Sequence, residues 1–250
     1  MASNAKVSST TTEEICELVL DNPGRKNALS YALLDDLSKK LAAAEEDAVR
    51  AVILTGAGDA FSAGADFADL TGTIDDLEID NAIELVVQQI RSFPAPVIAA
   101  IDGPCMGGAI DIALACDLLV ASDHAVFEMP AARLGLLYNP SAIRRWSARL
   151  NSLTLRRMLL LSERFSAAEA LQAGMVSHLV EGGSALAYAK ELATRSAQCT
   201  REAIAGYKGV LVALENGETD LTRWEQLRKE TLESSERLER VSRAKESTKN

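Results

Sequence analysis

Short apolar segments of strand length alternate with longer segments of helical length along most of this chain, and this alternation limits the folds it can adopt. The strand-like runs cover residues 13–20, 51–58, 95–102, 117–122 and 176–180. The helical segments cover residues 30–47, 74–93, 107–116 and 165–174. Strands that alternate with helices form right-handed βαβ units around a largely parallel sheet. The sequence therefore predicts an α/β fold.

The two ends of the chain differ from this pattern. Residues 1–12 are polar, lack the apolar core of a signal peptide, and are expected to form a flexible tail. From about residue 184 onward the pattern is helical and increasingly charged. We therefore expect a core over residues 13–195 and a helical C-terminal region over residues 196–250.

Composition excludes several classes of function. The net charge of −10 argues against nucleic-acid binding, because phosphate contacts need clustered cations. No stretch approaches the roughly 18 to 20 apolar residues of a membrane span, so no membrane partner is expected and the protein is predicted to be cytoplasmic. The four cysteines form no CxxC pair and are expected to be small apolar fillers, and no metal-binding motif occurs.

A pair of glycines in "DGPCMGGAID" (102–111) stands where the apolar helix 107–116 should begin. The first N–H groups of a helix lack internal partners, and glycine lets a ligand oxygen approach them closely. Gly64 and Ala65 in "GDAFSAGADF" (58–67) form a second such place after a turn. Two amides directed at one oxygen would stabilise an oxyanion, whereas the alternative is that these glycines only permit tight turns and close packing.

Asp111 follows three residues after the second glycine and has isoleucine on both sides. An acid in the first turn of a helix can simply complement the helix dipole. A carboxylate in apolar surroundings, however, has a raised pKa that suits proton transfer. The only histidines, His124 and His178, are expected to be structural, which leaves little support for a serine triad.

"AFSAGADF" (60–67) and "IDGPCMGGAIDIALACDLLVAS" (101–122) together strongly resemble the crotonase, or enoyl-CoA hydratase/isomerase, superfamily. The resemblance extends to "NPGRKNALS" (22–30) and "FSAAEALQAGMVSHLV" (165–180) and weakens after about residue 215. It implies a spiral of ββα units with a helical C-terminal region. It also implies assembly as a homotrimer or hexamer.

The resemblance implies an acyl-CoA thioester as substrate, with coenzyme A as part of that substrate and no separate cofactor. Members of the family hold the thioester carbonyl between two backbone amides, which by motif position are those of Ala65 and Gly108. Asp111 falls at a catalytic position, and a role in fatty acid metabolism is implied. The implied CoA-binding residues are Arg25, Lys26, Ala28, Ala63, Asp66 and Phe67. For Arg25 and Lys26 the alternative is that they are solvated charges of a turn.

Ordinary hydratases of this family use two catalytic glutamates, and Asp111 stands at the position of the first. At the position of the second, in "FEMPAARLG" (127–135), this chain has Ala131. Standard hydration needs both carboxylates. "RLGLLYNPSAIRRW" (133–146) instead resembles methylmalonyl-CoA decarboxylase, in which a tyrosine stands where this chain has Tyr138. That enzyme has histidine at the position of Ala65, so the second resemblance is partial.

The sequence thus predicts an acyl-CoA-processing lyase or isomerase, with Asp111 as the proton-transfer residue and Tyr138 as its helper. Two alternatives remain open: a decarboxylase of a malonyl-type CoA, and an acyl-CoA-binding protein without catalysis. For Tyr138 itself, the alternative to a role in the chemistry is that its hydroxyl group only anchors a loop.

Overall fold

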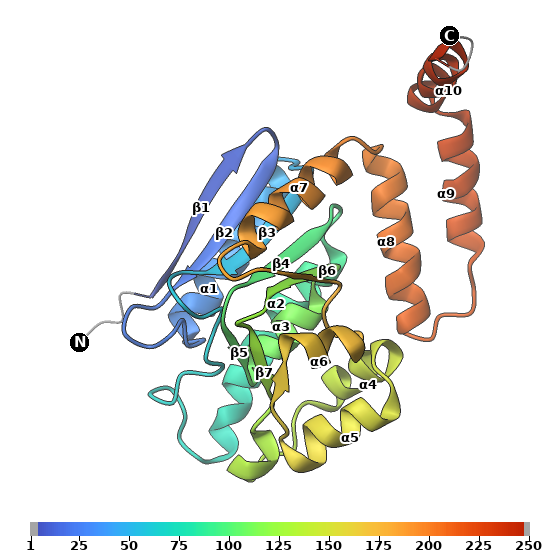
Figure 1. Cartoon of the computed structure of the whole chain (residues 1–250). Coiled ribbons are helices and arrows are strands. Elements are labelled where there is room, and N and C mark those ends of the chain that lie inside the picture. Colours follow the sequence, from blue (N-terminus) through green and yellow to red (C-terminus); the bar gives the residue numbers. More distant parts are fainter. Residues whose placement is uncertain (1–4, 248–250) are drawn as a thin grey trace.

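Two β-sheets form the centre of the protein, whose structure, a computed structural model, describes residues 5–247 (Figure 1). The strands of the large sheet are, in spatial order, β1 (Lys6–Thr12), β2 (Ile15–Asp21), β3 (Ala51–Gly56), β4 (Val97–Ile101), β6 (Leu118–Ser122) and β9 (His178–Val180). The small sheet contains β5 (Pro104–Met106), β7 (Val126–Glu128) and β8 (Phe165–Ser166). Only the β1–β2 and β7–β8 pairs are antiparallel.

Helices cover the sheets and continue beyond them at the C-terminus. The helices of the core are α1 (Tyr31–Glu46), α2 (Leu77–Ser92), α3 (Gly108–Ala115), α4 (Pro140–Arg149), α5 (Ser152–Leu161), α6 (Ala167–Gln172) and α7 (Ala185–Ala197). Two short 3-10 helices, η1 (Ile74–Asp76) and η2 (Ala131–Leu134), precede α2 and α4. The C-terminal helices are α8 (Arg201–Glu215), α9 (Thr222–Glu233) and α10 (Ser235–Ser247).

The central strands are buried on both faces, which explains why they read as continuous apolar runs instead of alternating ones. In β3, Val52 and Leu54 belong to the large core shared with α1, α2 and α3. Ile53 faces the other way, into a smaller core that contains Ala189 and Ala193 of α7. The large sheet therefore lies between two layers of helices.

The chain passes repeatedly from the large sheet to the small sheet and then into a helix. β4 of the large sheet is followed by β5 of the small sheet and by α3, and β6 is followed by β7 and then by η2 and α4. These are the ββα units of a spiral, and the α/β fold predicted from the sequence is confirmed. The same passage brings the start of α3 out at the edge of the small sheet, where the candidate site lies.

The expectation of a flexible tail over residues 1–12 is wrong for residues 6–12, which form β1. This strand pairs along its whole length with β2, from Lys6 opposite Asp21 to Thr12 opposite Ile15. Its side chains are almost all polar and only Val7 is buried, so the apolar signal of a strand is missing. Residues 1–4 lie outside the described part of the chain.

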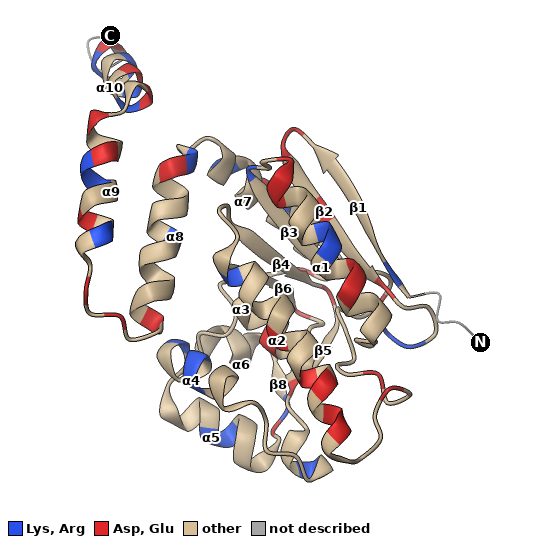
Figure 2. Ribbon diagram, turned by 180° about the vertical axis from the view of Figure 1, so that it is seen from behind, with Lys and Arg blue, Asp and Glu red and all other residues tan. Residues whose placement is uncertain are grey.

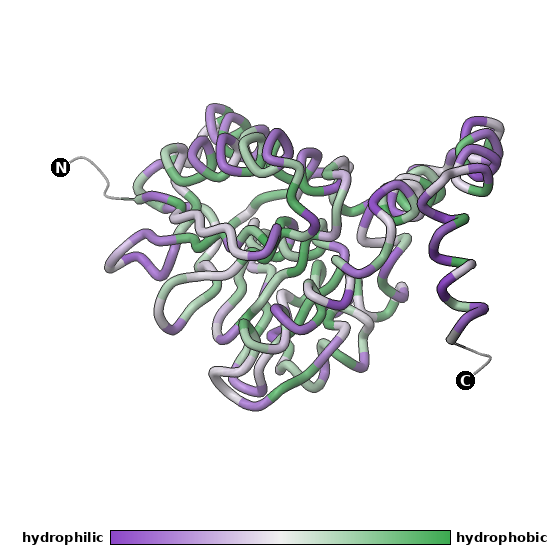
Figure 3. The backbone as a smooth tube through the Cα atoms, turned by 90° about the horizontal axis from the view of Figure 1, so that it is seen from above, coloured by the Kyte–Doolittle hydropathy of each residue, from purple (hydrophilic) through white to green (hydrophobic). Residues whose placement is uncertain are grey.

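The C-terminal helices extend away from the sheets, and α9 and α10 reach the far end of the molecule (Figures 1 and 3). Hydrophilic residues dominate α9 and α10, and no residue of α9 is buried (Figure 3). α8 is fixed to the core more firmly, because the buried Lys208 donates to the carbonyls of Ile90 and Ala95 and to Asp117.

Candidate active site

The loop over residues 62–65 runs beside the chain that leads from β5 into α3. The N–H of Met106 donates to the carbonyl oxygen of Ser62 at 3.0 Å. Gly64 has a φ of +86°, and a Cβ on it would lie only 2.7 Å from the carbonyl oxygen of Met106. Gly107 has a φ of +52°, and a Cβ on it would lie 3.8 Å from the Cα of Gly64, in ordinary contact. Glycine is therefore required here by both conformation and close approach, and the two backbones bring Ala65 and Gly108 together.

The amide groups of Ala65 and Gly108 differ from their neighbours in the hydrogen bonds that they make within the described part of the chain. Gly108 is the first residue of α3, so its N–H precedes the hydrogen bonds of the helix. Ala65 bridges to Leu29, but the bonds of that bridge use the carbonyl of Gly64 and the N–H of Asp66. Within residues 5–247 neither N–H donates a hydrogen bond to another group of the protein.

The hydroxyl group of Tyr138 lies beside Gly108, 3.7 Å from the position of a Cβ on that glycine. Tyr138 is buried, and its ring stacks on Trp146 with centroids 5.2 Å apart. The hydroxyl donates to Asp111 Oδ2 over 3.5 Å. The structure therefore brings Tyr138 and Asp111, both named by the sequence, next to the start of α3.

Asp111 is almost fully buried, but its surroundings are not simply apolar. Arg145 Nη2 lies 3.2 Å from both of its oxygens, and Trp146 Nε1 donates to Oδ1 at 3.1 Å. Burial raises the pKa of Asp111 to about 6, and the charge and hydrogen bond of Arg145 oppose that rise. Sequence analysis predicted the raised pKa but missed Arg145 and Trp146. Both residues belong to "RRW" (144–146), and the sequence does not show which way their side chains point.

Glu84 on α2 holds Arg145 in place by accepting two hydrogen bonds of 2.8 Å from Nη1 and Nη2. Burial alone would raise the pKa of Glu84, but the hydrogen bond from Arg145 lowers it on balance. Glu84 also accepts from Asn139 Nδ2 at 3.3 Å, and Asn139 directly follows Tyr138. A closed ring of contacts therefore connects Tyr138 through Asp111, Arg145, Glu84 and Asn139 back to itself.

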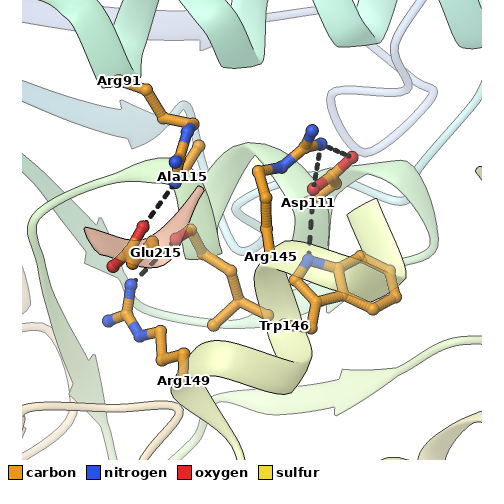
Figure 4. A pocket seen from close by; sticks show the side chains of 8 residues that line it. Arg91, Asp111, Ala115, Arg145, Trp146, Arg149 and Glu215 are labelled. Atoms are coloured by element: carbon orange, nitrogen blue, oxygen red, sulfur yellow. Dashed lines mark hydrogen bonds and ion pairs between the residues drawn. The ribbon is translucent and has the colours of Figure 1, made fainter. Parts of the chain in front are cut away.

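A small cavity borders Asp111 on the side of Arg145 and Arg149 (Figure 4). Arg91 and Glu215 form an ion pair of 2.7 Å at its wall, and Arg149 donates to the carbonyl of Leu114. Its volume of about 10 Å³ is enough for roughly one water molecule and not for a substrate.

Glu128, the acid that precedes residue 131 in the same segment, does not take the place of the missing glutamate. Ala131 is buried in η2 and offers only a methyl group. Glu128, three residues earlier, is buried too, but Arg133 binds one of its oxygens and Arg164 binds the other at 2.8 Å. Glu128 therefore does not supply the carboxylate that is missing at residue 131.

The predicted CoA-binding residues come together from two loops. The N–H of Ala63 donates to the carbonyl of Lys26 at 2.9 Å, and Arg25 Nη1 lies 2.5 Å from Asp66 Oδ1. Asp66 is buried and also accepts from the N–H of Ala68, so its carboxylate joins the loops. Ala28 is buried, whereas Ala63 is exposed and Phe67 is 69% exposed.

Asn27, which the sequence analysis did not single out, is the second clamp between these loops. Its Nδ2 donates to the carbonyls of Ala57 and Ala60, both at 2.8 Å, and its Oδ1 accepts from the N–H of Asn22. Asn27 has a φ of +55°, a conformation that asparagine tolerates better than most residues. Its place in a turn was the only signal that the sequence offered.

The remaining polar candidates lie elsewhere. His124 is exposed beside Asp123, and His178 lies on β9 near Tyr188. Three cysteines are buried as expected, but Cys199 is exposed. Residues 5–247 contain no group of three or more His, Cys, Asp or Glu suited to a metal ion. In the same part of the chain, no helix combines the length and apolar character needed to cross a membrane.

Comparisons with known proteins agree on one family. The family model described as enoyl-CoA hydratase/isomerase matches residues 10–248. The Mycobacterium tuberculosis protein named probable enoyl-CoA hydratase echA6 is 35% identical over 184 residues, 74% of either chain. The 2,3-dehydroadipyl-CoA hydratase of Escherichia coli is 31% identical over 216 residues, 82% of this chain and 83% of its own.

Solved structures show the same relationship. An enoyl-CoA hydratase/isomerase family protein from Hyphomonas neptunium has a TM-score of 0.91 at 28% identity, covering 99% of this chain and 97% of its own. Methylmalonyl-CoA decarboxylase in complex with 2-nitronate-propionyl-CoA has a TM-score of 0.80 at 27% identity, covering 90% and 89%. The glycine-lined loops, the fold and these matches show that the chain belongs to the enoyl-CoA hydratase/isomerase family.

Proposed function

We propose that this protein is an enzyme that binds an acyl-CoA thioester and stabilises its enolate between the amides of Ala65 and Gly108. The observation that carries the proposal is the pair of N–H groups without internal partners on two adjacent backbones. Donors fixed in place before the reaction stabilise charge that develops on an oxygen, and removing one typically raises the barrier by about 3 kcal/mol.

Tyr138 and Asp111 would move the proton that accompanies enolate formation. The hydroxyl of Tyr138 is the group that faces Gly108, and Asp111 lies behind it as a hydrogen-bond acceptor. A proton taken from the α-carbon passes to the tyrosine oxygen as the phenolic proton passes to the ionised Asp111. The electrons of the C–H bond form the C=C bond of the enolate, and the π electrons of the carbonyl move to the thioester oxygen. Reversal returns the proton to the α-carbon or to another carbon of the enolate.

A single relay of this kind suits proton transfer within the substrate better than standard hydration. Hydration in this family uses two carboxylates, and this chain has alanine at residue 131, where the second would stand. Isomerisation needs one group that removes a proton and returns it elsewhere. We therefore place the activity on the isomerase side of the family.

The remaining expectations from the sequence belong to the same proposal. Lys26 and the free side of the Arg25 guanidinium would contact CoA phosphates, with Ala28, Ala63, Asp66 and Phe67 shaping the surrounding loops. No cofactor besides the CoA of the substrate is proposed, the assembly is a homotrimer or hexamer, and the protein acts in the cytoplasm. Light scattering on the protein as it elutes from a size-exclusion column measures the molar mass of the assembly directly.

A panel of 2-enoyl-, 3-enoyl- and malonyl-type CoA thioesters, followed by mass detection of the products, tests the activity. The wild-type protein should shift the double bond of an enoyl-CoA or exchange its α-hydrogen with deuterated water. Both activities should fall steeply in Asp111→Asn. Thioester binding without any turnover would instead support the non-catalytic binding protein.

A decarboxylase of a malonyl-type CoA is the second candidate, and the place of Tyr138 favours it. The phenol beside Gly108 could hold a leaving carboxylate, and the similarity to methylmalonyl-CoA decarboxylase agrees with this. Release of CO2 from methylmalonyl-CoA that is lost in Tyr138→Phe would support this candidate over isomerisation.

A further inference from the structure

One face of α2 lies against the start of α3 and presents Asp80, Ile83 and Glu84 at helical spacing. Ile83 Cδ1 lies 2.7 Å from the position of a Cβ on Gly108, and Glu84 binds Arg145. Asp80 stands one turn before these residues, toward the N-terminus of α2. It is partly buried, and its carboxylate is close enough to Tyr138 to contribute to the raised pKa of that phenol, after burial and Asp111.

Asp80 differs from the other acids of the site because nothing neutralises it. Asp111 is bound by Arg145 and Trp146, and Glu84 by Arg145. Across residues 5–247, Asp80 takes part in no hydrogen bond or ion pair, and burial together with the charge of Asp76 raises its pKa. Arg145 therefore serves Glu84 and Asp111, and the carboxylate of Asp80, which also acts on Tyr138, has no cation of its own in this part of the chain.

Further negative charges surround this face of α2. Acidic residues gather at the start of α2 and in the segment before it (Figure 2). Arg91 acts on Glu84 from further along α2, but it is already paired with Glu215. A negative group brought to this place would meet the negative charge of Asp80, which is partly buried and which no nearby cation of the described chain neutralises.

We propose that Asp80 makes the acyl site selective for acyl chains without negative charge, so that chains ending in a carboxylate are rejected. This inference rests on the proposed function, because it takes the acyl chain of the bound thioester to lie beside Tyr138 and Ile83. Like charges placed close together in a binding site are an effective means of excluding the wrong ligand. The same charge disfavours the malonyl-type substrate of the second candidate function.

Calorimetric binding of three CoA thioesters of matched length tests the proposal: hexanoyl-CoA, adipoyl-CoA and the monomethyl ester of adipoyl-CoA. The wild-type protein should bind adipoyl-CoA on the order of tenfold or more weakly than the other two. Asp80→Asn keeps the size of the side chain and should remove most of that difference. Glu78→Gln is the matched control, because it deletes the same charge from an exposed position in the first turn of α2.

The ester comparison uses the unmodified protein, so the proposal is testable even if Asp80→Asn does not fold. Equal affinity of the wild-type protein for adipoyl-CoA and its methyl ester would overturn the proposal while leaving the proposed function intact. So would discrimination that Asp80→Asn and Glu78→Gln reduce equally. A wild-type protein that binds none of the three thioesters would contradict the proposed function and this inference with it.

Discussion

At the scale of single residues, the charge state of Asp111 depends on opposing neighbours. Burial favours its neutral form, and Arg145, at 3.2 Å from both oxygens, favours its ionised form. The resulting pKa of about 6 lies above the value of 3.8 of an exposed aspartate. A carboxylate that titrates near neutral pH can both accept and return a proton, as the relay through Tyr138 requires.

The raised pKa of Asp111 also predicts how stability changes with pH. The folded state holds the Asp111 proton more tightly than the unfolded state, so protonation stabilises the folded state as the pH falls through 6 toward 4. Between pH 7.5 and pH 5 the wild-type protein should gain about 1 kcal/mol relative to Asp111→Asn, which does not titrate. Urea unfolding of both proteins at the two pH values measures this. A relative loss at pH 5 would show that the carboxylate is held ionised in the folded state.

Tyr138→Phe tests the other half of the relay. The substitution removes the hydroxyl beside Gly108 and keeps the ring that stacks on Trp146. Turnover should fall by about 100-fold or more, as expected for loss of a proton-transfer group, with little change in thioester binding. A variant with weakened binding and unchanged turnover would mean that Tyr138 only anchors its loop.

The candidate residues predicted from the sequence lie mainly in short glycine-rich motifs, and the residues that contact them from other helices were not predicted. Ala65, Gly108 and Asp111 belong to two motifs whose backbones meet. Glu84 and Asp80, by contrast, are ordinary acids of an amphipathic helix, and nothing local distinguishes them from solvated ones. Their contacts depend on how α2 packs on α3, which the spacing of apolar residues does not specify.

At the scale of elements, helix caps and apolar periodicity were sufficient to predict those helices whose signal lies in their own residues. Ser30 accepts from the N–H of Leu33 at the start of α1, and Ser166 and Glu169 form a capping box at α6. β1 was missed because an edge strand with one buried residue has no apolar pattern. Its pairing with β2 decides its structure, and pairing is not a local property.

The attachment of α8 gives a prediction at this scale. Lys208 is 7% exposed and donates to two carbonyls and to Asp117, with distances from 2.7 to 3.1 Å. Lys208→Met would remove this donor from all three acceptors, leaving Asp117 with the N–H of Val97 but without its cation, and should destabilise the protein by about 3–5 kcal/mol. Lys229→Met on the exposed α9 should change stability by less than about 0.5 kcal/mol.

Urea unfolding of the two lysine variants gives the comparison, and hydrogen exchange of α8 gives its location. The amides of α8 should exchange faster in Lys208→Met, while those of β3 and β4 change less. Equal stability of both variants would mean that Lys208 does not fix α8 to the core.

At the scale of the whole molecule, the spiral joins two loops that lie about forty residues apart in the sequence. The alternation of strands and helices predicted the α/β class, and the parallel order of β2, β3, β4, β6 and β9 confirms it. The passage between two sheets could not be read from periodicity, because β5 and β7 have only three residues each. That passage brings Ala65 beside Gly108 and produces the site.

The infrared carbonyl stretch of a bound thioester, labelled with ¹³C at the carbonyl, tests the central claim most directly. Two amide hydrogen bonds polarise the carbonyl, so its stretch should move to lower frequency on binding to the wild-type protein. Ala65→Pro replaces one N–H that has no internal partner and should reverse part of that movement. A bound thioester that absorbs at the frequency of the free thioester, in both proteins, would contradict the account.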